Sequence, residues 1–313
     1  RSMMMALNEA VLPGSHYSYE ILFEDNRLDG ARSVSAAQKF LNFDKVDAVL
    51  TLWPPTANVV LPFTERAQVL HYTIAWDPEL ARKNRFLLSH QAMVDEIARS
   101  TLRLLRREGK LRVAFLHMEE AGFNLGAGYL RRLSAEEGIS FVADEAFNPQ
   151  ENDFRSLVKK TAAKSPDAYL IWAVMPSLDA LIRQVRELDS SAWITGYLDY
   201  AQDTSQIQNA VYVSEMFASG FFVDAYREKY GEDPVSKGPN AYDITRLLVQ
   251  AFEASPARKL SALELKTYLT GIRDYQGAVG RFSIDKFGNS TYAPVLRQIA
   301  GAERKLLPSG DNR

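Results

Sequence analysis

Two stretches of the sequence decide the fold: Val46-Asp-Ala-Val-Leu-Thr-Leu-Trp-Pro-Pro-Thr56 and Pro166-Asp-Ala-Tyr-Leu-Ile-Trp-Ala-Val-Met-Pro-Ser177. Each has Asp-Ala, a short apolar run typical of a buried strand, a Trp, and then Pro with a hydroxyl residue at the start of a helical pattern. The two Asp residues lie 120 positions apart and the two hydroxyl residues 121. A βα unit repeated at the spacing of a domain predicts two similar α/β lobes.

The same alternation of strand and helix patterns extends from residue 17 to about residue 200 and predicts parallel sheets. The expected strands are 19–23, 48–52, 69–74, 112–118, 139–143, 168–174 and 193–197. The expected helices are 31–42, 56–66, 92–108, 126–137, 154–163 and 177–188. Three consecutive helices (221–230, 242–253 and 262–270) and two late strands (280–284 and 295–299) follow.

The length also favours two domains, because 313 residues are about twice an ordinary domain. We expect two three-layer lobes. The first comprises 1–113 and 217–291, and the second comprises 114–216 and 292–313. Residues 2–10 already have the pattern of an amphipathic helix, so we expect the chain to begin inside a domain.

Composition excludes several classes of function. The 37 Lys and Arg residues nearly balance the 39 Asp and Glu, and a formal net charge of −2 gives no general attraction for nucleic acid or anionic membranes. The chain has no cysteine, which rules out disulfides, thiolate nucleophiles and Cys-ligated zinc. No apolar run reaches the length of a membrane span.

Motifs for catalysis and cofactor binding are missing as well. The four histidines show no zinc-ligand spacing such as HExxH. Gly126-Ala-Gly128 opens a helical pattern, but Arg131 occupies the third glycine position of a dinucleotide fingerprint. Neither a phosphate-binding GxxxxGK[ST] loop nor a GxSxG nucleophile motif is present. We therefore expect no metal, no cofactor and no enzymatic activity.

The loops after the strands are the candidate site, because ligands of open parallel sheets bind beyond the carboxyl ends of the strands. Thr56 and Ser177 stand where N-cap residues would stand, and a helix N-terminus attracts an anion such as a carboxylate. Capping alone would explain both residues equally. Five aromatic residues at or just after strand ends suggest an apolar, π-rich pocket: Trp53, Trp76, Phe123, Trp172 and Tyr197.

Over nearly its whole length the sequence resembles the type I periplasmic substrate-binding proteins of branched-chain amino-acid ABC transporters, the group that includes the Leu/Ile/Val-binding proteins. The resemblance is carried by Leu22-Phe-Glu-Asp25, by Val46-Asp-Ala-Val49 with Pro54-Pro-Thr56, and by His71-Tyr-Thr-Ile-Ala-Trp-Asp-Pro-Glu-Leu80. Further landmarks are Gly126-Ala-Gly128, Ala241-Tyr-Asp243 and Gly280-Arg-Phe-Ser-Ile-Asp-Lys-Phe-Gly288. It implies an α/β fold of two Rossmann-like lobes joined by three crossings, with a ligand clamped between them. It also implies that a first strand and a signal peptide precede Arg1.

The resemblance also implies site residues. In the first lobe, Pro55, Thr56, Ile74 and Trp76 would hold a ligand carboxylate, with Trp53 filling space where relatives keep small residues. In the second lobe, Asn124 or Leu125 and Val174 or Met175 would face the ligand. Amino-acid binders of the family place an acidic residue after the strand that here ends at Tyr197. Leu198 aligns there, and Asp199 is next to it, so either Asp199 binds an ammonium group or the ligand has none.

The resulting expectation is a monomeric, extracytoplasmic solute receptor, periplasmic or lipid-anchored outside the cell. It would bind an amino acid or an aromatic or apolar acid and deliver it to an ABC permease. The alternative is a ligand-sensing module of the same fold, as in amide sensors and receptor ectodomains.

Overall fold

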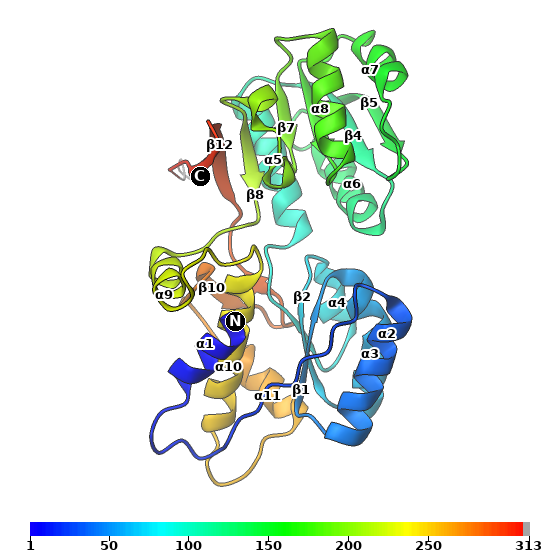
Figure 1. Ribbon diagram of the computed structural model, residues 1–313. Coiled ribbons are helices and arrows are strands. Elements are labelled where there is room, and N and C mark those ends of the chain that lie inside the picture. Colours follow the sequence, from blue (N-terminus) through cyan, green and yellow to red (C-terminus); the bar gives the residue numbers. More distant parts are fainter. Residues whose placement is uncertain (309–313) are drawn as a thin grey trace. The chain divides into compact units, whose positions relative to one another are not determined.

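The computed structural model describes residues 1–308 and divides into two compact units (Figure 1). Unit 1 comprises Arg1–Met93 and Met216–Tyr292. Unit 2 comprises Val94–Glu215 and the C-terminal segment from Ala293. The chain therefore passes three times from one unit to the other.

Unit 1 is built on a parallel sheet with strand order β1-β2-β3. Its strands are β1 (Ala48–Leu52), β2 (Leu70–Ile74) and β3 (Leu87–Ser89). The helices are α1 (Ser2–Ala10), α2 (Gly30–Lys39), η1 (Phe40–Asp44), α3 (Pro54–Ala67), α4 (Pro78–Lys83), α9 (Gly220–Tyr230), α10 (Gly238–Glu253) and α11 (Ala262–Leu269). A small antiparallel sheet has the order β11-β10-β9, formed by β9 (Tyr275–Gly277), β10 (Gly280–Ile284) and β11 (Ser290–Thr291).

Strand β2 shows how the layers of unit 1 are filled. All five of its residues are buried. Leu70 and Tyr72 belong to one apolar cluster with Leu247 of α10 and Leu265 of α11. His71 points the other way, because successive residues of a strand face opposite sides, and its ring contacts the hydroxyls of Thr51 and Thr64. Helices thus cover both faces, as a parallel sheet requires.

A buried polar cluster joins distant segments of unit 1. Asp243 of α10 is fully buried, and its carboxylate accepts hydrogen bonds from the N–H groups of Ala278 (2.6 Å) and Val279 (3.0 Å). The Nε2 atom of His90, also fully buried, lies 3.5 Å from Asp243 Oδ2. His90 Nδ1 lies 2.6 Å from the hydroxyl of Ser290. One carboxylate therefore holds α10, the β9–β10 turn and the segment after β3 together.

Unit 2 contains a parallel sheet with strand order β5-β4-β6-β7. Its strands are β4 (Arg112–Met118), β5 (Ser140–Phe147), β6 (Ala168–Trp172) and β7 (Ile194–Gly196). Its helices are α5 (Val94–Arg107), α6 (Ala121–Ser134), α7 (Arg155–Ala162) and α8 (Ser177–Leu188), with short 3-10 turns η2 (Leu198–Tyr200) and η3 (Thr204–Ile207). An antiparallel sheet with the order β13-β12-β8 comprises β8 (Val211–Ser214), β12 (Val295–Ala300) and β13 (Glu303–Leu306).

One expected domain boundary differs from the structure. Helix α5, expected at the end of the first lobe, belongs to unit 2, so the first passage falls after Met93 instead of after residue 113. The reason is packing: α5 contacts α6 and β8. Arg99 and Arg106 of α5 also form ion pairs with Glu136 and Glu137, which follow α6. The other two passages lie within one residue of the expected positions.

The expected strand at residues 19–23 is not formed; this segment is extended but belongs to no strand in the described part of the chain. Its start is instead tied to the end of α10. The carboxylate of Glu253 accepts hydrogen bonds from the N–H of His16 (2.9 Å) and from the hydroxyl of Tyr19 (2.6 Å). Apolar alternation alone predicted the strand, but a strand also needs a hydrogen-bonded neighbour.

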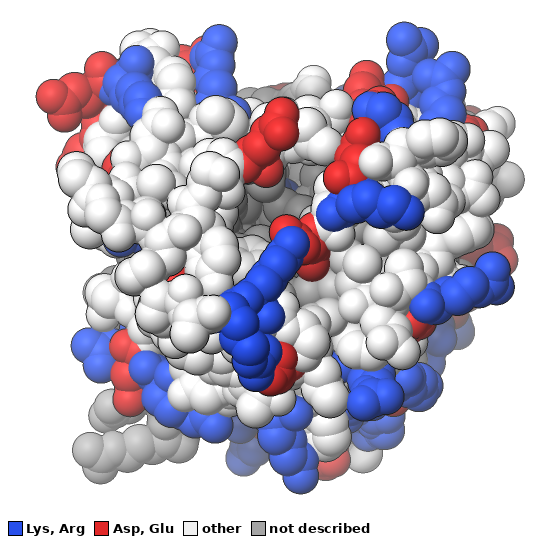
Figure 2. All heavy atoms as spheres, turned by 90° about the horizontal axis from the view of Figure 1, so that it is seen from below, with Lys and Arg blue, Asp and Glu red and all other residues white. Residues whose placement is uncertain are grey.

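Charged groups are mixed over the surface. On the face drawn in Figure 2, basic and acidic side chains alternate among uncharged ones, and neither sign forms a broad patch. This distribution agrees with the near-zero net charge of the whole chain.

A glycine inside α6 is a sensitive test of the unit 2 core. A Cβ at Gly126 would lie 2.1 Å from Cζ3 of the buried Trp172, whereas a Cβ at Gly128, on the exposed side of the helix, meets nothing within 4 Å. We expect Gly126→Ala to lower the free energy of unfolding by about 1–3 kcal/mol through overpacking. Gly128→Ala should raise it by up to about 1 kcal/mol, because Ala favours helix. Urea unfolding measures both, and equal effects would contradict this packing.

Candidate functional site

In unit 1, two loops follow the carboxyl ends of adjacent strands. Trp53 follows β1 and is 37% exposed, whereas Ile74, the last residue of β2, and Trp76, just after it, are buried. The Trp53 N–H donates to the carbonyl of Ile74 over 3.1 Å, so the two loops begin side by side. Pro55 is exposed at the start of α3.

Thr56 is not the N-cap of α3, contrary to expectation. The helix begins two residues earlier, at Pro54, and Trp53 is the N-cap. Proline is favoured in the first turn of a helix because it has no N–H to leave unsatisfied. Thr56 is therefore the third helical residue. Its side chain is buried, and its Oγ1 accepts a hydrogen bond from Asn26 Nδ2 at 3.5 Å.

Ser177 is not an N-cap either, and its hydroxyl holds a neighbouring loop. Pro176 is the N-cap of α8. The buried Ser177 Oγ donates to the carbonyls of Pro149 (2.9 Å) and Glu151 (3.2 Å). The predicted role of this hydroxyl, to cap its own helix, is therefore wrong.

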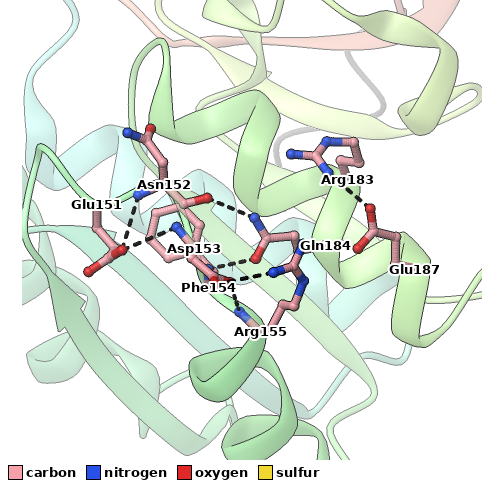
Figure 3. Close-up of polar contacts among 8 residues, drawn as sticks. All are labelled: Glu151, Asn152, Asp153, Phe154, Arg155, Arg183, Gln184 and Glu187. Carbon is pink, nitrogen blue, oxygen red and sulfur yellow. Dashed lines mark hydrogen bonds and ion pairs between the residues drawn. The ribbon is translucent and has the colours of Figure 1, made fainter.

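The same loop, residues 148–154, is fixed a second time by Gln184 of α8 (Figure 3). The Gln184 Oε1 accepts from the N–H of Phe154 over 2.6 Å, and its Nε2 donates to the carbonyl of Asn152 over 2.8 Å. One buried amide thus satisfies both a donor and an acceptor of the loop. The β5–α7 and β6–α8 loops of unit 2 therefore form one connected structure.

The other residues expected in unit 2 divide into core and surface. Trp172 is buried at the end of β6 and meets Phe115 edge to face, with 5.9 Å between the ring centroids, so it belongs to the core. Phe123 is buried in the first turns of α6. Asn124 is exposed, and three side chains are partly buried: Leu125, Val174 and Met175.

Three aromatic rings gather where β7 ends. The ring of Tyr197 meets that of Phe123 edge to face at 5.6 Å and stacks on that of Tyr200 at 5.0 Å. The hydroxyl of the buried Tyr197 donates to Glu215 Oε1 over 2.5 Å. Burial, together with the Glu215 charge, raises the pKa of Tyr197 well above its usual value, so the phenol remains a donor.

Sequence reasoning missed Glu215. This buried acidic residue directly follows β8, a strand that was not predicted. The structure brings Glu215 to Tyr197, which follows β7. The signal that could have found it is the short alternation Val211-Tyr-Val-Ser214, which ends at an acidic residue.

The hydrogen-bonding capacity of Asp199 is largely used inside unit 2. Its Oδ1 accepts from the hydroxyl of Tyr212 (2.8 Å) and its Oδ2 from that of Ser214 (2.6 Å). Burial raises the pKa of the Asp199 carboxyl above its ordinary 3.8, although these two hydrogen bonds oppose the shift. Leu198, next to it, is fully buried. Asp199 thus braces η2 against β8.

The histidines have structural partners, as the two described above illustrate, and among residues 1–308 no group of three or more His, Cys, Asp or Glu side chains could hold a metal ion. No helix of this part of the chain is both long and apolar enough to cross a membrane. What the geometry does provide is a set of aromatic and acidic side chains after β7 and β8. Small-molecule sites commonly combine apolar rings with a few fixed polar groups in this way.

A comparison with protein families identifies the class to which this protein belongs. The family model described as periplasmic binding protein matches residues 16–296, and the chain belongs to this family. The members are solute-binding proteins without enzymatic activity, which confirms the expected fold and the absence of a catalytic role. A comparison with curated protein sequences finds none that matches.

Three solved structures illustrate the likeness of fold. The leucine-binding protein LivK of Thermotoga maritima has a TM-score of 0.84 at 18% identity, over 98% of this chain and 91% of that one. A solute-binding protein of an ABC transporter from Rhodopseudomonas palustris, in complex with 3,4-dihydroxybenzoic acid, has a TM-score of 0.82 at 16% identity, over 97% and 88%. LivJ of Streptococcus pneumoniae, in complex with isoleucine, has a TM-score of 0.79 at 19% identity, over 98% and 92%.

The raised pKa of Asp199 leads to a test of its structural role. The carboxyl of Asp199 binds a proton more readily in the native state than in the unfolded chain. The ionised carboxylate therefore destabilises the fold at neutral pH, and this destabilisation disappears on acidification. We expect the unfolding free energy of the wild type, relative to Asp199→Asn, to rise as the pH falls from about 7 to about 4.

Asp203 is the control, because hydrogen bonds from Ser205 lower the pKa of its exposed carboxyl. Relative to Asp203→Asn, the wild type should stay equally stable down to a pH of about 4 and lose stability only as the pH falls below the ordinary pKa of the carboxyl. Chemical denaturation at a series of pH values measures both differences. A pH-independent difference for Asp199→Asn would contradict the assigned burial.

Proposed function

We propose that this chain is the solute-binding component of an ABC transporter, acts outside the cytoplasm as a monomer, and delivers its ligand to a membrane permease. The ligand is a small carboxylate-bearing molecule, either an amino acid or an aromatic or apolar acid. Family membership supports the role. The ligands named for the related structures, isoleucine and 3,4-dihydroxybenzoic acid, support the ligand class.

The observation that carries the proposal is the grouping of Phe123 of α6 with Tyr197, Tyr200 and Glu215, which follow β7 and β8. Rings provide apolar contact area, and a small number of fixed polar groups orients a ligand within it. The Tyr197 hydroxyl fixes the Glu215 carboxylate at 2.5 Å, so the acid is already oriented before a ligand arrives. Preorganised polar groups lower the entropic cost of binding.

In unit 1, we assign the ligand carboxylate to the start of α3. Pro54 and Pro55 have no N–H, so Thr56 is the first residue of this helix with a backbone donor. The first turn of a helix leaves its N–H groups without intrahelical acceptors and carries a partial positive charge. A ligand carboxylate at Thr56 would accept a hydrogen bond from this N–H and would be attracted by the partial positive charge.

For a ligand with an amino group, we assign the ammonium to Glu215 instead of Asp199. Both oxygens of Asp199 accept hydrogen bonds from β8, from Tyr212 and Ser214, so its carboxylate serves the internal packing of unit 2. The Glu215 carboxylate accepts from Tyr197 and therefore lies against the group of aromatic rings that would contact the ligand.

A ligand screen tests the function. Leucine, isoleucine, phenylalanine, benzoate and 3-phenylpropionate should be titrated against the purified protein in a thermal-unfolding assay. A compound that binds the native state adds about 2.7 kcal/mol of stability at 100 times its dissociation constant. At least one compound should raise the midpoint in proportion to the logarithm of its concentration. No shift from any carboxylate at millimolar concentration would refute the assignment.

Two variants test the ammonium assignment. Glu215→Gln keeps an oxygen that can accept from Tyr197 but removes the charge. It should weaken binding of phenylalanine at least tenfold, about 1.4 kcal/mol, and leave 3-phenylpropionate unchanged. Asp199→Asn is the matched control and should preserve the ratio of the two affinities. If Asp199→Asn abolishes the preference for the amine while Glu215→Gln does not, the assignment to Glu215 is wrong. Isothermal titration calorimetry gives these affinities.

A further inference from the structure

Trp53 has a backbone conformation that side chains other than glycine rarely adopt. Its φ is 75° and its ψ is 142°. The neighbours impose this conformation: the Trp53 N–H donates to Ile74 of β2, and the Trp53 carbonyl accepts from Ala57 of α3, each over 3.1 Å. Strained residues of this kind concentrate at binding sites. The stability of unit 1 alone would favour glycine at this position.

The indole of Trp53 is also more exposed than those of two other tryptophans at strand ends. Trp76, which follows the neighbouring strand, is 6% exposed, and Trp172, which ends β6 in unit 2, is 2% exposed. Trp53 is 37% exposed, and Leu52 before it is 38% exposed. Packing in the core of unit 1 therefore does not explain why an indole is present at this position.

The sequence around Trp53 has few groups that could bind a charge. Pro54 and Pro55 remove two of the N–H donors that a helix start normally offers. No Lys or Arg occurs from Val46 to Glu65. The loop offers an indole, two pyrrolidine rings and a leucine, and Thr56 beyond them provides the first backbone N–H of the helix. This surface suits a flat, uncharged part of a ligand.

We propose that Trp53 is a specificity-determining residue that selects ligands with an aromatic ring, which stacks against the exposed indole. The proposal rests on the proposed function, because it assigns the ligand class for the same loop. An aromatic ring binds an indole more favourably than an aliphatic group of equal size does. The reason is that the electrostatic attraction between two rings adds to the free energy of burying apolar area. One backbone donor is enough to orient a carboxylate attached to such a ring.

Matched ligands and variants test the proposal. The ligand pairs are benzoate with cyclohexanecarboxylate and phenylalanine with leucine, titrated by calorimetry. Trp53→Gly suits the observed φ and removes the indole. Trp53→Leu keeps apolar bulk but removes the ring. Trp193→Leu, at the opposite, amino end of β7, is the control for loss of a tryptophan.

The wild type should prefer the aromatic member of at least one pair. Trp53→Gly and Trp53→Leu should each reduce that preference roughly tenfold. Trp193→Leu should leave it unchanged. Trp53→Gly should unfold at the same or a higher temperature than the wild type, because it relieves the strained backbone, so lost affinity cannot be attributed to misfolding.

Three results would overturn the proposal. If the wild type prefers the aromatic member of neither pair, Trp53 does not select rings, and the proposed function stands. The same holds if the Trp53 variants keep the full aromatic preference. If none of the four compounds binds the wild type, this inference fails, and the proposed function fails with it when isoleucine and 3-phenylpropionate do not bind either.

Discussion

The buried carboxylate of Asp243 is the constraint on which unit 1 depends. An ionised group in an apolar interior is costly unless hydrogen bonds or an opposite charge compensate it. The N–H groups of Ala278 and Val279 provide this compensation, and the ring of His90, from another segment, lies beside the carboxylate. The space is narrow, since a Cβ at Gly277 would lie 2.5 Å from Asp243 Oδ2. The position of α10 is therefore tied to that of the β9–β10 turn.

Sequence patterns predicted those strands and helices that depend mainly on neighbouring residues. The repeated βα units gave β1 and β6 correctly because an apolar run after Asp-Ala and a helix-starting proline are both short-range signals. The same signals misplaced the N-caps by one to three residues, because Pro54 and Pro176 move the helix starts toward the strand. Exact helix ends depend on caps that the periodicity of the helix does not reveal.

Long-range pairing could not be predicted in this way. Strand β8 has only four residues, and it is formed by pairing with β12, more than 80 positions further along the chain. Because this strand was not predicted, Glu215, which follows it, was overlooked. Asp199 was considered because it is next to Leu198, which aligns with the acidic position of the family, yet its oxygens accept from Tyr212 and Ser214 of β8. Tertiary contacts decide which acidic group lies against the aromatic rings.

The division of the chain into units also has a consequence for the order of folding. The parallel sheet of unit 2 lies within the continuous segment Val94–Glu215, whereas unit 1 needs Arg1–Met93 together with Met216–Tyr292. During synthesis from the N-terminus, the first half of unit 1 emerges first but lacks α10 and the partners of His90, one of which, Ser290, lies 200 residues away. The later segment can thus complete its sheet before the earlier one does. Until α10 and α11 have emerged, the apolar face of β2 stays uncovered, and exposed apolar surface of this kind favours aggregation of a newly made chain.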